Sequence, residues 1–276
     1  MGLAVLTSGG DAPGMNAAVA AFADAAGEAV AVRRGFAGLQ AGELESLDRG
    51  RADAHRDRAG TWLGSSRQPE LDVAACVRAL GGAALCVIGG HGSHQGARAI
   101  AAAGVPVAFI PATIDGDVPG TATSLGFDSA VAYALRVVEQ MRTTGRSLPG
   151  RIFVLETLGG PTEHLALAVA RAAGIEHALV PGGELRVDGL AERAAAGDAI
   201  LVMSEGAGDA VAVAARITER TGVRARYTIL GHAQRAAPPT PRDLALGEAA
   251  GRAAAALLAR GETGFVTLPD AVTAPL

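Results

Sequence analysis

Lysine is absent from the sequence, and cysteine and aromatic residues are scarce. All 24 cationic side chains among the 276 residues are arginines. Chemistry that depends on a lysine is therefore excluded, including phosphate binding by the lysine of a Walker A loop. The two cysteines, Cys76 and Cys86, lack the spacing of a metal site or a redox pair. Their apolar surroundings predict buried thiols that take no part in chemistry.

Long hydrophobic runs are absent as well. Although 49% of the residues are apolar, no stretch approaches the ~20 consecutive apolar residues that span a bilayer. The first residues carry neither the basic start nor the cleavage pattern of a signal peptide. The net charge of −4 argues against general binding of nucleic acid or anionic membranes. We therefore expect a cytoplasmic protein with neither a membrane nor a nucleic acid as partner.

The chain alternates short apolar runs with alanine-rich stretches, a pattern typical of an α/β protein. Strands that are apolar on both faces and separated by helices predict parallel sheets covered on both sides. A stretch rich in Gly, Ser and Pro at 144–150 predicts a linker. The expected strands are Leu3–Leu6, Ala29–Arg33, Ala84–Ile88, Val107–Ile110, Ile152–Leu155, Ala178–Val180, Ala199–Met203 and Arg226–Leu230, and the expected helices include Asn16–Ala26, Leu71–Leu80, Phe127–Thr143, Glu163–Ala173 and Val211–Thr221.

Two glycine-rich loops follow predicted strands and open predicted helices. They read TSGGDAPGMN at 7–16 and VIGGHGSHQGA at 87–97. Glycines at such turns let backbone N–H groups close on a phosphate at a helix N-terminus. Taken alone, the first loop fits a tight turn as well as it fits a phosphate site. The second carries His91 where a metal-binding carboxylate would be useful.

The motif PATIDGDVPGT at 111–121 places Asp115 and Asp117 two residues apart, just beyond a strand. In extended backbone such residues project to the same side. One carboxylate would accept a proton from an attacking hydroxyl, and the other would hold a metal or orient the first. An ordinary acidic turn gives the same pattern.

Four cationic or ionisable side chains lie near other strand ends. His232 and Arg235 belong to LGHAQRAA at 230–237, Arg226 precedes them on the predicted strand, and Arg151 begins the strand after the predicted linker. Together they predict a clamp for a sugar phosphate, because arginine binds phosphate through paired hydrogen bonds. Each of these arginines alone is equally explained as a solvated surface charge.

Taken in order, these motifs resemble the 6-phosphofructokinase family. The match runs from LTSGGDAPGMNA through GTWLGSSRQPE, VIGGHGS, PATIDGD, the Arg151 strand, Glu205 and RYTILGHAQR, and so covers nearly the whole chain. The resemblance implies two α/β domains with parallel-rich sheets, helices on both faces and an active site between them. It implies a larger nucleotide domain at 1–126 plus 234–276 and a smaller sugar-phosphate domain at 127–233. It also implies ATP with Mg²⁺, and a homo-oligomer, a dimer or a tetramer, with shared active sites.

The resemblance also assigns roles to matching positions. Asp115 would be the base for the sugar 1-hydroxyl, with Thr113 and Asp117 beside it, and Asp117 and Asp11 would hold the metal. Arg151 and Arg226 would reach in from a neighbouring subunit. The implied nucleotide or phosphate residues are Gly10, Asp11, Arg67, Gly90, His91, Gly92, Ser93 and Gly96, and the implied sugar-phosphate residues are Arg151, Gly159, Glu205, Arg226, His232 and Arg235.

The sequence departs from the family pattern mainly on the donor side. His91 replaces the loop aspartate that helps to hold magnesium, and Gly160 replaces the arginine that faces the transferred phosphate. Gln68, Asp72 and Gly116 also differ from the pattern. Magnesium prefers oxygen ligands, so His91 is a poor substitute; a histidine can instead donate to a phosphate or act as an acid or base.

Three functions remain open from the sequence. The first is an ATP-dependent kinase acting on a sugar phosphate such as fructose 6-phosphate, as in glycolysis. The second is a relative that uses pyrophosphate, in which an aspartate typically stands at the position of Gly92 and a lysine at that of Ala112; this sequence fits the ATP type better. The third is a sugar-phosphate binding protein with little phosphoryl transfer.

Overall fold

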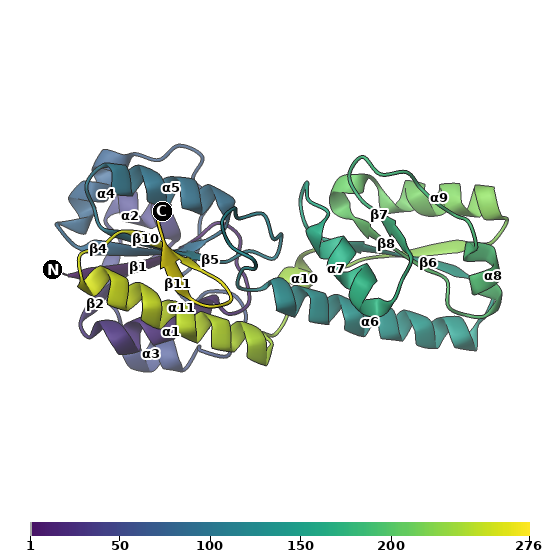
Figure 1. The fold of residues 1–276 in the computed structure, drawn as a ribbon, viewed down its shortest axis with the longest axis horizontal. Coiled ribbons are helices and arrows are strands. Elements are labelled where there is room, and N and C mark those ends of the chain that lie inside the picture. The colour runs from purple at the N-terminus through teal and green to yellow at the C-terminus, as the bar shows by residue number, and fades with distance from the viewer. Residues whose placement is uncertain (1) are drawn as a thin grey trace. The chain divides into compact units, whose positions relative to one another are not determined.

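The computed structural model describes residues 2–276. Its strands form two separate sheets, and each sheet lies at the centre of one compact unit (Figure 1). Unit 1 contains the chain as far as Thr113, then Asp117–Ser129 and Pro238–Leu276. Unit 2 contains Ile114–Gly116 and Ala130–Ala237. The chain thus passes between units within a few residues of the predicted boundaries, 126/127 and 233/234. The sequence did not predict that Ile114–Gly116 belongs to unit 2.

Unit 1 is built on a sheet of seven strands in the order β11-β10-β5-β4-β1-β2-β3. β1 pairs in parallel with both β2 and β4, so that Leu3 lies beside Ala29 on one side and Ala84 on the other. The two outermost pairs, β2–β3 and β10–β11, are antiparallel. The strands are β1 (Leu3–Ser8), β2 (Ala29–Val32), β3 (Leu44–Ser46), β4 (Ala84–Gly89), β5 (Val107–Pro111), β10 (Gly264–Thr267) and β11 (Val272–Ala274).

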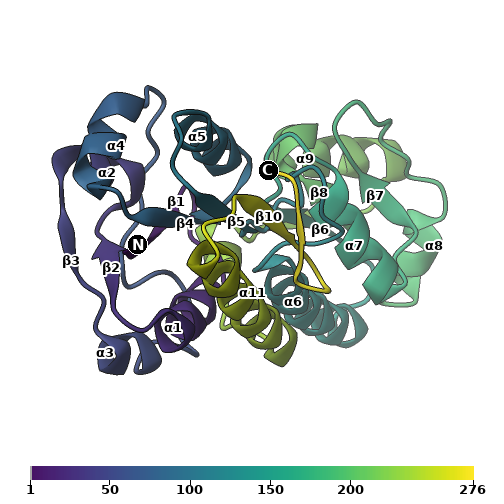
Figure 2. The ribbon, with the colours of Figure 1, turned by 60° about the vertical axis from the view of Figure 1, so that its left-hand side comes forward.

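Helices cover both faces of this sheet. The helices of unit 1 are α1 (Met15–Ala26), α2 (Gly35–Ala41), α3 (Arg49–Asp53), α4 (Val73–Leu80), α5 (His91–Ala102) and α11 (Pro241–Ala259). Figure 2 shows α1, α3 and α11 on one face of the sheet and α2, α4 and α5 on the other. Apolar side chains of β1, β4 and β5 such as Leu6, Val87 and Phe109 form the core with α2, α4 and α5. The predicted α/β class with helices on both faces is confirmed.

Glycines allow α1 and α11 to pack closely. A Cβ atom at Gly247 would lie 2.6 Å from the carbonyl oxygen of Gly14, and one at Gly251 would collide with the backbone of Ala18. Because these two glycines are four residues apart, they lie on the same face of α11. The close packing fixes α11 against the start of α1, directly after the TSGGDAPG loop.

Unit 2 is built on a parallel sheet of four strands in the order β7-β8-β6-β9. Side chains alternate along its strands: Val154 and Leu201 pack with α8 and α9, whereas Leu155 and Val202 pack with α6 and α7. The sheet is therefore covered on both faces, as predicted. The elements are α6 (Phe127–Ser147), β6 (Ile152–Thr157), α7 (His164–Ala173), β7 (His177–Leu179), α8 (Leu190–Ala195), β8 (Ile200–Ser204), the short 3₁₀ helix η1 (Glu205–Ala207), α9 (Ala210–Thr221), β9 (Ala225–Ile229) and α10 (His232–Arg235).

Two features of the fold differ from the prediction. The expected linker at 144–150 is wrong for its first half, because α6 continues to Ser147. Gly145 is a site of close packing, since a Cβ there would collide with the carbonyl oxygen of Gly197. The sequence also did not predict β3, β10 and β11. The antiparallel pairing of β3 and β11 makes the sheet of unit 1 mixed instead of purely parallel.

Cys76 and Cys86 are buried free thiols, as predicted, and burial raises the pKa of Cys76 to about 11.

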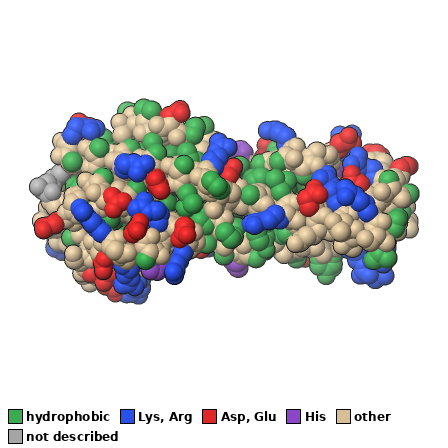
Figure 3. All heavy atoms as spheres, turned by 90° about the horizontal axis from the view of Figure 1, so that it is seen from below, with side chains coloured by type: hydrophobic (Ala, Val, Ile, Leu, Met, Phe, Trp, Pro, Cys, Tyr) green, Lys and Arg blue, Asp and Glu red, His purple; other side chains and the backbone are tan. Residues whose placement is uncertain are grey.

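Figure 3 shows arginine and acidic side chains interspersed on the side of unit 1 that carries α1, α3 and α11. Arg56 pairs there with Asp24 at 2.7 Å and Asp53 at 2.8 Å. Within residues 2–276, no helix combines the length and the apolar character that crossing a membrane requires.

Candidate active site

Three loops of unit 1 meet where β1, β4 and β5 end. The hydroxyl of Thr7 lies 2.7 Å from that of Thr61, and the N–H of Gly9 donates to the carbonyl of Ser66 at 3.0 Å. The GTWLGSSRQ segment thereby lies against the TSGGDAPG loop. A Cβ at Gly9 would lie 3.3 Å from the hydroxyl of Ser93, which lies in the first turn of α5 after the third loop. The structure therefore brings together the segments that carry Gly10, Arg67 and Ser93.

The N-terminus of α5 fits a phosphate group. Gly90 is its N-cap and supplies no capping side chain, so the N–H groups of the first turn are available to a ligand. A Cβ at Gly89 would lie 2.5 Å from the carbonyl oxygen of Ser8, which explains why this position is a glycine. Gly92 is exposed with open space around it. Gly96 has a different reason, because a Cβ there would lie 2.8 Å from the Phe36 ring.

His91 is the first residue of α5 and its side chain is exposed. Its Nε2 lies 3.0 Å from Nε2 of Gln95, one turn further along the helix. The neighbouring His94 is different, since its ring packs against those of Phe109 and Phe265 at centroid distances of 4.8 and 5.4 Å. Burial, with Arg98 and His91 nearby, lowers the pKa of His94. His94 is therefore a core histidine, whereas His91 faces solvent where a ligand phosphate would bind.

The PATIDGD segment does not have the backbone that the prediction assumed. Gly116 lies in the left-handed region at φ +67°, so the argument from extended backbone about Asp115 and Asp117 is wrong. Thr113 is buried and fixed to the next segment by the Ser124 hydroxyl, which donates to its carbonyl at 2.6 Å. Asp117 has one buried carboxylate oxygen, Oδ1, without a hydrogen-bond partner. A glycine at 116 is explained by the positive φ.

In unit 2, Asp115 lies beside Arg235. Nη2 of Arg235 is 3.6 Å from Oδ1 of Asp115, and both side chains are mostly buried, with 14% and 22% exposed. The hydroxyl of Thr162 donates to the backbone carbonyl of Asp115 at 3.0 Å, which fixes the segment to the loop after β6. The structure thus places the predicted base next to a predicted phosphate-binding arginine.

Glu205 holds the loop that contains Gly159 and Gly160. Its Oε1 accepts hydrogen bonds from the N–H groups of Gly159 at 3.1 Å and Gly160 at 2.7 Å. These two amides therefore converge on one anionic oxygen. Burial and the nearby charge of Glu205 raise the pKa of Glu156, which lies near the carboxyl end of β6. The loop can bind an oxygen of a ligand if Glu205 moves aside.

Within one chain, Arg151 and Arg226 lie away from this group. Arg151 directly precedes β6, and Arg226 lies beside Phe153 near the start of β9. His232, Arg235 and Glu205 instead follow the carboxyl ends of parallel strands. At ~3.3 Å per residue, the length of β6 separates the two groups by roughly 15 Å.

Sequence reasoning missed Gln234, which is fully buried between His232 and Arg235 on α10. Its side chain bonds to the loop after β6 and to α6. A polar residue between two predicted ligand-binding residues was the only available signal.

Among residues 2–276, no group of three or more His, Cys, Asp or Glu side chains is arranged to hold a metal ion.

Comparisons with known proteins agree with this architecture. The phosphofructokinase family model matches residues 2–258. The chain is 38% identical over 279 aligned positions to an ATP-dependent 6-phosphofructokinase of Lysinibacillus sphaericus, covering 95% of this chain and 87% of the relative. It is 35% identical to the protein of the same description from Bacillus subtilis strain 168, with the same coverage.

Solved structures show the same fold. Pichia pastoris phosphofructokinase in the T-state superposes with a TM-score of 0.87 at 24% identity over 99% of this chain. This chain spans about a third, 34%, of the Pichia chain. A pyrophosphate-dependent phosphofructokinase from Nitrosospira multiformis superposes with a TM-score of 0.84 at 22% identity, covering 95% of this chain and 78% of that one. The predicted resemblance is confirmed: the chain belongs to the phosphofructokinase family.

Proposed function

We propose that the protein transfers the γ-phosphoryl group of ATP to the 1-hydroxyl of a sugar phosphate such as fructose 6-phosphate. The observation that carries this proposal is the 3.6 Å pair of Asp115 and Arg235, which sets a carboxylate base beside a phosphate-binding cation. The bacterial relatives at 35–38% identity, which are named as ATP-dependent, support ATP as the donor. The pyrophosphate-dependent structure is only 22% identical and supports the fold alone.

The chemistry needs a base and a fixed acceptor. Asp115 takes the proton of the sugar hydroxyl while the hydroxyl oxygen bonds to the γ-phosphorus, and the bond from that phosphorus to the bridging oxygen of ADP breaks. Arg235 and His232 bind the phosphate that the sugar already carries. Glu205 accepts a hydrogen bond from a sugar hydroxyl, and the amides of Gly159 and Gly160, which donate to Glu205 in this structure, bind a sugar oxygen once Glu205 turns away from them.

The donor side belongs to unit 1. The open N-terminus of α5 and the glycines at 9, 10, 89 and 90 allow backbone N–H groups to approach the phosphates of ATP. His91 stands on the first turn of α5 and donates a hydrogen bond to one of these phosphates, and Arg67 lies on the exposed loop next to Ser66.

A magnesium ion fits Asp117 in part. The buried Oδ1 of Asp117 has no hydrogen-bond partner and would become a metal ligand. Asp11, on another loop of unit 1, would be the second carboxylate ligand. Magnesium is commonly bound by one or two carboxylates together with substrate phosphates and water. When bound, the metal would neutralise charge on the transferred phosphoryl group. His91 is not among its preferred ligands.

The positions of Arg151 and Arg226 support a homo-oligomer in which a second copy lends them to the site. Both lie at the end of the sheet of unit 2 opposite to Arg235. β9 is also an edge strand with exposed Tyr227 and Ile229, at 48% and 50%. An exposed apolar edge strand is a surface that another chain commonly covers.

A donor and acceptor screen tests the function. The purified protein is supplied with ATP or pyrophosphate, a panel of hexose and pentose phosphates including fructose 6-phosphate, and a magnesium titration. We expect transfer from ATP, with turnover lowered about 10²–10⁴-fold by Asp115→Asn while sugar-phosphate affinity stays nearly constant. Transfer from pyrophosphate alone, or an Asn variant as active as the parent, would contradict the proposal.

A further inference from the structure

Gln234 occupies an unusual place, because it is fully buried between two side chains that must face a ligand. His232 and Arg235 flank it on α10, a helix of only four residues. Gly231, at φ +51°, begins the helix without a capping side chain. So short a helix has almost no stability of its own, since nucleation is unfavourable until several residues are bonded. Its orientation must come from contacts with the rest of unit 2.

The side chain of Gln234 supplies two such contacts. Its Oε1 accepts the N–H of Leu158 at 2.9 Å, and its Nε2 donates to the carbonyl of Ala130 at 3.1 Å. Only one orientation of the amide satisfies both partners, because the first needs an acceptor and the second a donor. The amide therefore fixes α10 against the loop after β6 and against α6.

The groups tied together in this way are those of the acceptor site. Leu158 directly precedes Gly159 and Gly160, whose amides converge on Glu205. Arg235, next to Gln234, lies 3.6 Å from Asp115. A shift of α10 would therefore move Arg235 away from Asp115, and a shift of the loop would move the two glycine amides. One buried amide governs the distance between the two groups of ligand-binding residues.

We propose that Gln234 is a positioning residue for sugar-phosphate binding, which holds His232 and Arg235 in register with the Gly159–Gly160 amides. It touches no substrate atom itself. This inference rests on the proposed function only for the identity of the ligand. Loss of the amide leaves the N–H of Leu158 without its partner and removes the tie to the carbonyl of Ala130, which keeps its place in the hydrogen bonding of α6. We expect this loss to misplace a charged ligand-binding group and so to weaken binding.

The test compares four variants by titration calorimetry with fructose 6-phosphate and by steady-state kinetics with ATP. Gln234→Leu removes both hydrogen bonds at similar volume. Gln140→Leu makes the same change at an exposed position of α6. Ile217→Ala creates a cavity in the core beneath α9 and serves as a destabilised control. We expect Gln234→Leu to weaken sugar-phosphate binding about tenfold or more while the KM for ATP changes less than about twofold.

The fourth variant, Gln234→Glu, tests the geometry even if Gln234→Leu fails to fold. A protonated carboxyl can accept from Leu158 and donate to Ala130, whereas a carboxylate cannot donate. Its sugar-phosphate affinity relative to the parent should therefore recover several-fold as the pH falls from 8 to 6. A purely structural role would produce no such recovery.

The outcomes separate this inference from the proposed function. If the parent binds fructose 6-phosphate but transfers no phosphoryl group, the function is wrong and the binding series still decides the role of Gln234. If Ile217→Ala weakens binding as much as Gln234→Leu at equal loss of stability, Gln234 has only a structural role. Unchanged binding in Gln234→Leu, or a pH-independent ratio in Gln234→Glu, would also overturn the inference.

Discussion

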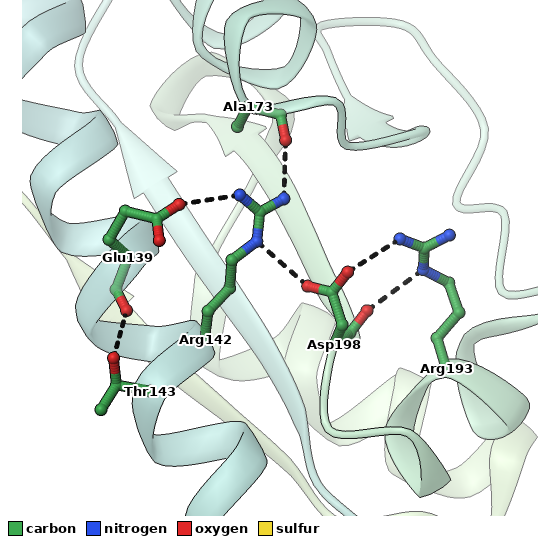
Figure 4. A network of polar contacts seen from close by, with 6 residues as sticks. All are labelled: Glu139, Arg142, Thr143, Ala173, Arg193 and Asp198. Atoms are coloured by element: carbon green, nitrogen blue, oxygen red, sulfur yellow. Dashed lines mark hydrogen bonds and ion pairs between the residues drawn. The ribbon is translucent and has the colours of Figure 1, made fainter.

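Replacing Arg142 by methionine should destabilise unit 2, because this arginine joins several elements. Figure 4 shows its guanidinium between Glu139, Asp198 and the carbonyl of Ala173, with hydrogen bonds of 2.8, 3.1 and 2.6 Å. The Arg142 side chain is only 16% exposed. These contacts connect α6 with the end of α7 and with Asp198, two residues before β8. Methionine keeps most of the apolar stem and removes the charge.

The three contacts contribute different amounts of free energy to the stability of unit 2. Glu139 is largely exposed, so its pair contributes at most ~0.5 kcal/mol. Ala173 ends α7 and its carbonyl has no helical partner, so the charged donor there is worth about 1–2 kcal/mol. Asp198 keeps a second partner in Arg193 at 3.3 Å, so its loss is limited to roughly 1 kcal/mol. We therefore expect a total loss of about 2–3 kcal/mol.

Urea unfolding measures this loss unit by unit. Circular dichroism reports the helices of both units, whereas the fluorescence of Trp62, the single tryptophan, reports unit 1. With an m-value of ~1.5 kcal/mol/M, the dichroism midpoint of Arg142→Met should fall by roughly 1–2 M. Arg146→Met, an exposed arginine one turn further along α6, is the matched control and should change stability by less than ~0.5 kcal/mol. Equal midpoints for the two variants would refute the reasoning.

Three further predictions concern the site and its surroundings. Arg235→Ala should weaken sugar-phosphate binding at least about tenfold, because it removes a charge-assisted contact; unchanged titrations for every sugar phosphate that binds the parent would reject its role. His91→Asp should raise magnesium affinity by returning an oxygen ligand, which a magnesium titration of parent and variant checks. A slower His91→Asp enzyme would instead make His91 part of the mechanism. His94→Phe should flatten the dependence of stability on pH. The pKa of His94 is lower in the folded protein than its unfolded value of ~6.5. The contribution of His94 to the free energy of unfolding is therefore present above that pH and is lost as the pH falls. Thermal unfolding at pH 7.5 and 5.5 checks this, and an equal loss in parent and variant would contradict it.

The sequence predicted the central strands well because they are apolar on both faces. β1, β4 and β5 are completely buried, and the run of apolar residues identifies them without any tertiary information. β3 and β11 are short and mostly exposed, so no apolar pattern distinguishes them from loops. The end of α6 was misjudged because Gly145 signals a turn by composition, whereas it is needed for the backbone of Gly197 to approach.

The site was predictable as a set of segments but not as a geometry. Loops after parallel strands meet at the carboxyl end of the sheet by topology, which brings the loops after β1 and β4 together. Ser66 follows no strand and lies there through its contact with Gly9. The left-handed backbone at Gly116 and the Gln234 amide depend on which partners surround them, and a single sequence does not contain that information.

The short excursion of Ile114–Gly116 into unit 2 has a consequence for how activity appears during folding. The chain passes between the units four times, at 113/114, 116/117, 129/130 and 237/238. Neither unit can therefore be released by a single proteolytic cut or expressed as one continuous piece. Asp115 takes its place only when the unit 1 residues on both sides of it and the unit 2 partners around it have folded. If Asp115 is the base, as proposed, activity should therefore appear only once both units have folded.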